Sequence, residues 1–116
     1  MAAPIAHIFS ALMLLNCGAF DVTKKSDYVC GTSFPDIRYL GVIARDQTHT
    51  KNATWDDVIN APTSFEKGRV VHSLLDEARW EFVKRHHLSD HILVPTWLYD
   101  TVLKFYEDML LYDLIR

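Results

Sequence analysis

The apolar residues of this chain recur at helical spacing in several segments, with glycine, proline and polar residues between them. Residues 4–16 open on a proline, which suits the first turn of a helix, and are rich in alanine, leucine and methionine up to a stop near Gly18. Residues 21–35 are polar and contain a glycine and a proline, so we expect turns there. The short apolar run at residues 37–44 fits either a helical turn or an extended piece.

The second half of the chain has clearer helix boundaries. Thr54 precedes acidic residues and predicts a short helix that ends near Asn60, because a threonine cap and first-turn carboxylates favour a helix start. The longest helix is expected over residues 63–87, where a threonine and a glutamate three residues later have capping-box spacing. Gly68 is the weak position in that pattern.

A last helix follows Pro95 and remains amphipathic up to Arg116. Its apolar residues recur at helical spacing and form one face: Leu98, Val102, Phe105, Met109 and Tyr112. A helix that is still amphipathic at the final residue indicates a shortened end or a surface that packs on something further. The aromatic residues of this segment would then serve as a homodimer or partner face: Trp97, Tyr99, Tyr106 and Tyr112.

Together these segments predict an all-α fold, a compact bundle of about four to five helices with long loops. The chain has 116 residues, enough to bury a core, and we assign residues 1–116 to a single helical domain. Its apolar fraction of 49% and charged fraction of 23% are typical of a globular protein. A formal charge of −3, with no run of basic residues, gives no sign of nucleic-acid binding.

The apolar N-terminal segment raises the question of targeting. A signal peptide has a basic start and a small-residue cleavage site, whereas the first basic residue here is Lys24 and His7 lies within the apolar run. The run is also shorter than the roughly 18–20 apolar residues of a transmembrane helix. We therefore expect a cytoplasmic protein, with secretion as the alternative. Cys17 and Cys30 are expected to be a reduced, partly buried pair, with a disulfide as the alternative.

His72 and Asp76 are the strongest candidates for chemistry. They are four residues apart on the longest expected helix, so their side chains leave one face a turn apart. Valine and leucine residues surround them, and a buried imidazole and carboxylate need partners or a metal ion. The alternative is a contact between the two side chains on a solvated surface.

Three further residues are metal-ligand types. His7 is a polar side chain on a helix that is otherwise built for burial, Asp36 follows a proline, and His49 follows a threonine. Taken singly, they fit a core histidine, a helix cap and an exposed loop histidine. With His72 and Asp76 they supply three imidazoles and two carboxylates, a mixed ligand set that zinc or manganese accepts.

Four short stretches resemble the zinc-dependent phospholipase C family, which is related to zinc-dependent single-strand nucleases: APIAHI at 3–8, GTSFPDIRYLG at 31–41, TH at 48–49 and HSLLD at 72–76. The resemblance covers most of residues 4–80. It implies a bundle of helices around a cluster of zinc ions held by an N-terminal histidine, a loop aspartate, a further histidine, and HxxxD and HxxxE pairs. Carried over to this chain, it implies five metal ligands: His7, Asp36, His49, His72 and Asp76.

The chain departs from that family in three ways. Members are roughly twice as long, no histidine after His72 has a glutamate four residues on, and the chain begins with MAA where secreted members use an N-terminal tryptophan as a ligand. We therefore expect one or two metal ions in place of the full cluster, in a domain that is C-terminally shortened relative to its family.

The resemblance implies a metal-dependent phosphoesterase that acts on a small phosphoester through metal-activated water. Asp36 would be the catalytic carboxylate that bridges ions or orients the water. Arg38 and Arg45 would bind the substrate phosphate by charge-assisted hydrogen bonds, with ion pairs to Asp36 or Asp46 as the alternative. The substrate is left open among lipid, nucleotide and sugar phosphates.

Two other functions compete with a phospholipase C-like phosphoesterase. One is a non-catalytic helical domain with a structural metal or a partner-binding role; catalytic zinc keeps a coordination position open, whereas structural zinc is closed. The other is an HD-type metal phosphohydrolase, which needs adjacent His-Asp, and this chain has Asp90-His91 in the reverse order.

Overall fold

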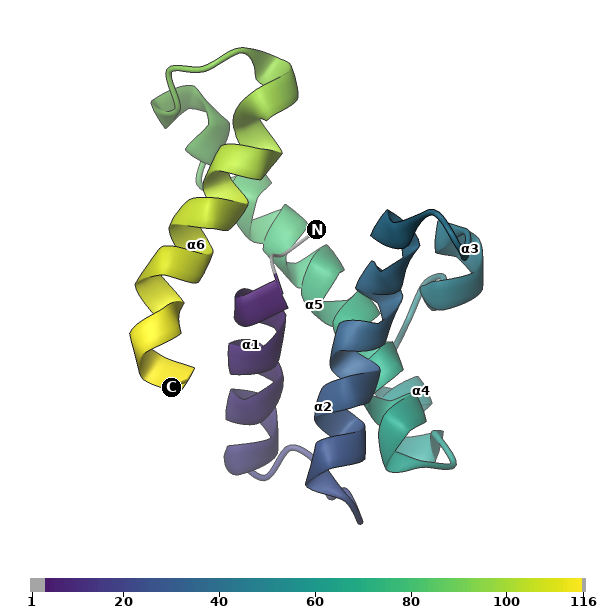
Figure 1. The fold of residues 1–116 in the computed structure, drawn as a ribbon. Helices are drawn as coiled ribbons and strands as arrows, with labels where there is room; N and C mark the ends of the chain where they lie inside the picture. The colour runs from purple at the N-terminus through teal and green to yellow at the C-terminus, as the bar shows by residue number, and fades with distance from the viewer. Residues whose placement is uncertain (1–3, 116) are drawn as a thin grey trace.

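A computed structural model describes residues 4–115, apart from the side chains of Arg38 and Tyr39. Within that range the chain forms helices and no strand, so the predicted all-α fold is confirmed (Figure 1). The elements in chain order are α1 (Pro4–Asn16), α2 (Lys25–Ser33), the 3₁₀ helix η1 (Phe34–Leu40), α3 (Arg45–Thr48), α4 (Trp55–Asn60), α5 (Ser64–Arg85), the 3₁₀ helices η2 (Leu88–His91) and η3 (Thr96–Leu98), and α6 (Tyr99–Ile115).

The helix starts at α4 and α5 follow their capping residues, as predicted. The hydroxyl of Thr54 accepts a hydrogen bond from the backbone N–H of Asp57, and the hydroxyl of Thr63 accepts one from Glu66. Each bond satisfies a backbone donor that a helix end otherwise leaves without a partner. These local bonds fix where α5 begins, and therefore the rotation of its later residues about the helix axis.

The prediction of turns over residues 21–35 is wrong, because α2 occupies Lys25–Ser33. Its helical state depends on tertiary packing more than on pattern. Tyr28 is fully buried, and its hydroxyl donates a 2.9 Å hydrogen bond to the carbonyl of Ala11 on α1. Thr32 is also fully buried. For the segment at 37–44 we left a helical turn and an extended piece open. The structure shows the helical form at its start, because η1 continues to Leu40.

Helix α2 crosses α5 at two glycines. A Cβ atom at Gly31 would collide with the backbone of Phe65, and one at Gly68 would collide with the backbone carbonyl of Tyr28. Glycine allows this close approach because it has no side chain. Gly68, a weak position in the helix pattern, is therefore what brings α2 and α5 together.

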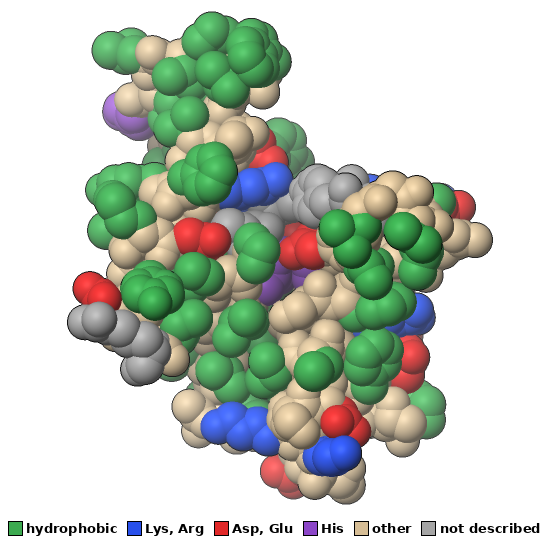
Figure 2. Space-filling view, viewed as in Figure 1, with side chains coloured by type: hydrophobic (Ala, Val, Ile, Leu, Met, Phe, Trp, Pro, Cys, Tyr) green, Lys and Arg blue, Asp and Glu red, His purple; other side chains and the backbone are tan. Residues whose placement is uncertain are grey.

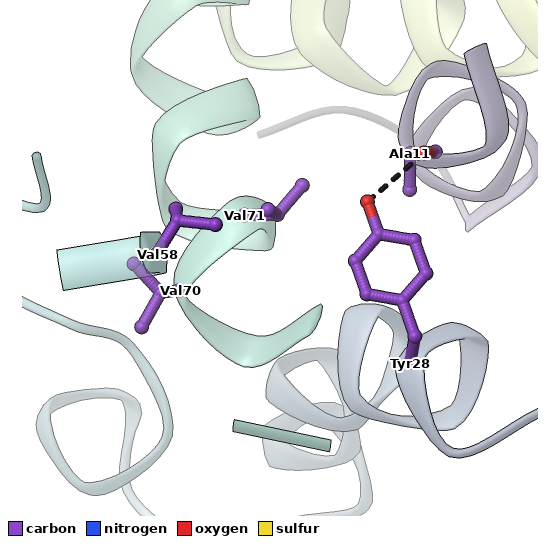
Figure 3. Close-up of a cluster of buried hydrophobic side chains, with 5 residues drawn as sticks. All are labelled: Ala11, Tyr28, Val58, Val70 and Val71. Atoms are coloured by element: carbon purple, nitrogen blue, oxygen red, sulfur yellow. Dashed lines mark hydrogen bonds between the residues drawn. The ribbon is translucent and has the colours of Figure 1, made fainter. Parts of the chain in front are cut away.

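The core lies where α1, α2, α4 and α5 meet. Ala11, Tyr28, Val58, Val70 and Val71 form its buried apolar cluster (Figure 3). Burial of this cluster fixes four helices relative to one another. Three of them, α1, α2 and α5, carry candidate site residues or lead directly to one.

Helix α6 lies beside α1 (Figure 1), yet none of its described residues is buried. Arg79 of α5 bonds both carboxylate oxygens of Glu107 through Nε, at 3.0 Å each, and Asp100 through a terminal nitrogen, at 3.0 Å. The backbone N–H of Ala6 donates to Asp108. Polar contacts therefore tie α6 to the body of the molecule at these three carboxylates.

Two smaller expectations can be compared with the structure. Cys17 and Cys30 have free thiols and are exposed, whereas we expected partial burial. None of the helices described is both long enough and apolar enough to cross a membrane.

Candidate metal centre

Five side chains that are far apart in the sequence meet beside the core. His7 comes from α1, Asp36 from η1, His49 from the end of α3, and His72 and Asp76 from successive turns of α5. All five of the predicted metal-ligand residues are in this group. Histidine and acidic side chains are visible at the base of a hollow in the molecular surface (Figure 2).

Asp76 lies at the centre of the group. Its Oδ1 is 3.1 Å from His7 Nε2, and its Oδ2 is 3.4 Å from His49 Nε2 and 3.5 Å from His72 Nε2. One carboxylate thus contacts three imidazoles from three different parts of the chain.

Asp36 approaches the same imidazoles from the η1 side. Its Oδ2 is 3.8 Å from His7 Nδ1, and its Oδ1 is 3.7 Å from His72 Nε2. The rings of His7 and His72 are stacked between the two aspartates, with centroids 3.7 Å apart and planes 16° apart. His49 meets His72 edge-on, at 5.0 Å.

The group is buried and short of hydrogen bonds. His7 and His72 are 1% and 0% exposed. Five buried atoms, on four side chains of the group, make no hydrogen bond within the part of the chain that the structure describes: His7 Nδ1, His7 Nε2, Asp36 Oδ1, His49 Nε2 and His72 Nε2. Buried polar atoms normally have partners, so these five need an explanation.

The spacing of the atoms fits a shared ion. Two ligand atoms that each lie roughly 2.1 Å from a tetrahedral ion are about 3.4 Å from one another. The contacts of Asp76 with the three imidazoles, at 3.1, 3.4 and 3.5 Å, are close to that value. One ligand atom from each of His7, His72 and Asp76 lies within 4.8 Å of the others, so this trio could hold a metal ion.

Backbone carbonyls set the tautomers of two histidines. His72 Nδ1 is 2.7 Å from the carbonyl oxygen of Thr32, near the end of α2. A carbonyl only accepts, so Nδ1 carries a proton, and in the neutral ring the lone pair of Nε2 would then face the group. His49 Nδ1 likewise faces the carbonyl of Arg45, at 3.2 Å, and the hydroxyl of Thr48, at 3.0 Å. This second contact of the ring is typical of metal-binding histidines.

The electrostatics favour the ligand forms of the side chains. Burial by itself raises the pKa of Asp76, but the imidazoles of His7 and His72 outweigh it, so that the pKa lies well below its usual range. Burial, then the neighbouring His72 and Arg45, lower the pKa of His49. A carboxylate and a neutral imidazole at neutral pH are the protonation states that metal ions bind.

A cavity of about 770 Å³ adjoins the group on one side. His49 and Asp76 form part of its wall, together with Arg45, Lys51 and Trp80. Arg45, a predicted substrate-binding residue, is 3.9 Å from Asp76 Oδ2 through a guanidinium nitrogen. The side chain of Arg38, the other predicted substrate-binding residue, lies outside the described residues.

Sequence reasoning missed several contributors to this site. The Thr32 carbonyl orients His72 but is a backbone group, so no residue type announces it. Ser73 accepts a hydrogen bond from the backbone N–H of Thr50, which ties the His49 segment to α5. Trp80 reaches the cavity one turn beyond Asp76, and that spacing was visible in the sequence.

Comparisons of the chain with protein-family models, with curated proteins and with solved structures found no match. The candidate metal centre therefore rests on its own geometry.

Proposed function

We propose that this chain binds a divalent metal ion, zinc in the first instance, at His7, Asp36, His49, His72 and Asp76, and hydrolyses a small phosphoester there. The observation that carries the proposal is the convergence of these buried nitrogen and oxygen atoms at 3.1–3.8 Å. Ion pairing explains it less well, because five of the buried atoms still make no hydrogen bond within the described residues. Histidine nitrogen and carboxylate oxygen are ligands that zinc accepts.

The resemblance to the zinc-dependent phospholipase C family supports the same proposal independently. It selects five residues from short sequence stretches, and these are the side chains that meet in space. Manganese or another divalent ion remains compatible with this ligand set.

Hydrolysis is favoured over a purely structural ion by the cavity beside the ligands. Because His49 and Asp76 form part of its wall, a substrate in the cavity would lie beside residues that we propose hold the ion. A bound divalent ion would lower the pKa of its water to about 7. Asp36 is only 14% exposed and faces His7 and His72. This position supports the proposal that its carboxylate would orient that water and accept its proton.

Arg45 gives the cavity a cationic group for the substrate. Its side chain is 56% exposed and lies on the cavity wall beside Asp76. A guanidinium binds phosphate oxygens through charge-assisted hydrogen bonds. We assign it to substrate binding and not to the ion, because arginine has no lone pair to donate.

The first test is the metal content of the purified chain by mass spectrometry. We expect zinc or manganese at one or more ions per chain, and its loss in the His72→Ala, Asp76→Ala double variant. The matched control is Asp90→Ala, His91→Ala, which removes an exposed histidine and aspartate and should keep the metal. Absence of metal in the parent, or equal metal in both variants, would contradict the proposed centre.

The second test separates catalysis from metal binding. The metal-loaded chain should hydrolyse p-nitrophenyl phosphate or bis(p-nitrophenyl) phosphate, and Arg45→Ala should lower kcat/KM while leaving the metal content unchanged. If the chain holds its metal and hydrolyses neither compound, the phosphoesterase proposal fails and the structural-metal alternative replaces it.

A further inference from the structure

Helix α6 turns its apolar side to solvent. Phe105 is 73% exposed, Met109 65% and Tyr112 53%, and Val102 continues the same line at 38%. We call these four residues the α6 stripe. Hydrophobic side chains line the α6 edge of the molecule (Figure 2). The sequence predicted this apolar face, and the structure directs it away from the body of the protein.

The polar contacts of α6 hold it in this orientation. Asp100 and Glu107 bond Arg79 of α5, and Asp108 bonds the backbone of α1. Rotating the helix to bury the stripe would break these contacts and expose Arg79, which is only 9% exposed. The polar contacts of α6 therefore account for the exposure of the stripe.

The exposed apolar surface is the right size for a protein interface. The stripe, with Tyr106, Leu110 and Leu114 at 55–65% exposure beside it, presents on the order of 800 Å² if each large side chain has roughly 200 Å². Monomers rarely show contiguous apolar patches beyond about 300–600 Å². A standard interface buries roughly 800 Å² on each partner.

The spacing of the stripe is symmetric. Its members follow one another at intervals of three, four and three residues, which is a coiled-coil seam. That order reads the same in both directions, so an antiparallel copy places Val102 against Tyr112 and Phe105 against Met109. An aromatic ring then meets the thioether of methionine, which is a favourable contact.

We propose that α6 is a homodimer interface, in which the stripe pairs antiparallel with the stripe of a second copy about a two-fold axis. A lipid surface fits less well. Helices that bind membranes carry lysine and arginine on their polar face, whereas Lys104 is the one basic residue of α6 and pairs with Asp100 at 2.7 Å. The pairing does not depend on the metal centre.

The test is the mass of the chain in solution, by sedimentation equilibrium over a range of protein concentrations. The parent should reach twice the 13.4 kDa of one chain at the highest concentrations. Phe105→Glu and Met109→Glu should each remain at the mass of one chain. Ile59→Glu is the matched control, because Ile59 is 59% exposed on α4 and receives the same charge change outside α6.

The control should dimerise like the parent, and circular dichroism should show the same helix content in all four proteins. A parent that stays monomeric throughout would overturn the proposal, and its binding to phosphatidylcholine vesicles would then point to a lipid surface. A parent dimer that persists in Phe105→Glu and Met109→Glu would overturn it equally.

Discussion

Polar side chains are usually exposed and large apolar side chains are usually buried. The group of metal-ligand residues breaks the first rule, and helix α6 breaks the second. At the first, histidines and aspartates are buried beside the core. At the second, Phe105 and Met109 face solvent while Arg79, Glu107 and Asp108 make the inner contact. Each departure costs free energy in an isolated chain, because buried polar atoms lose water and exposed apolar atoms order it.

Our two proposals complete each region with something other than its own side chains. A buried group of nitrogen and oxygen atoms is stabilised by a cation. An exposed apolar stripe is stabilised by contact with another apolar surface. If the two regions are independent, a substitution or a ligand at one of them should leave the other unchanged.

The largest expected effect is the loss of the helix crossing that builds the metal site. Gly68→Ala should lower the free energy of unfolding by about 3 kcal/mol, because the new methyl group meets the backbone of Tyr28 and that backbone cannot move aside cheaply. Urea denaturation followed by circular dichroism measures it. Phe105→Glu, at a dilution where the chain is monomeric, should change this free energy by at most about 0.5 kcal/mol. An equal decrease in the free energy of unfolding in both variants would contradict this expected difference between the two regions.

Zinc should stabilise the site and not the α6 pairing. At a free concentration 100 times its dissociation constant, a ligand specific to the folded state adds about 2.7 kcal/mol. For a chain of this size we expect a rise in Tm on the order of 10 °C. The shift should vanish in His72→Ala, Asp76→Ala and remain in Phe105→Glu. A shift that survives the double variant would place the zinc elsewhere.

A smaller effect tests how the core supports the site. Tyr28→Phe removes the hydroxyl that bonds the buried Ala11 carbonyl and should cost about 1 kcal/mol. Burial also raises the pKa of Tyr28, so the folded state favours the neutral phenol. The parent should therefore lose stability as the pH rises above the ordinary tyrosine pKa, and Tyr28→Phe should lose less. Identical alkaline profiles from denaturant titrations would contradict the assigned role.

The smallest effect concerns the metal-free protein at mildly acidic pH. Because the pKa of His49 is lowered in the folded state, stability is present above the ordinary histidine pKa and falls as the pH drops through the lowered value. In EDTA, His49→Gln should show a shallower loss of Tm between neutral pH and pH 5. An unchanged slope would mean that His49 is not buried in the neutral form.

Much of the fold was readable from local signals. The caps at Thr54 and Thr63 fix two helix starts through bonds within a single turn. Helix α2 was missed because its stability comes from Tyr28 and from the Gly31 and Gly68 contacts, which join residues distant in the sequence. The apolar face of α6 was found, but its direction depends on Arg79, so the sequence alone left that direction open.

The site was predictable to different degrees. His72 and Asp76 share a helix face, so their proximity follows from helix geometry. His7 stood out by its apolar surroundings. Asp36 and His49 were candidates as metal-ligand residue types, and the family resemblance added support, but nothing in their own neighbourhoods fixes a distance to α5. Their approach to Asp76 and His72 depends on how η1 and α3 pack.

The most direct test of the metal centre is X-ray absorption spectroscopy of the chain loaded with one equivalent of zinc. The account predicts a first shell of nitrogen and oxygen atoms at roughly 2.0–2.2 Å, with the outer-shell scattering of imidazole rings and no sulfur. A first shell with sulfur at roughly 2.3 Å would contradict it. Such a shell would assign the zinc to the exposed thiols of Cys17 or Cys30.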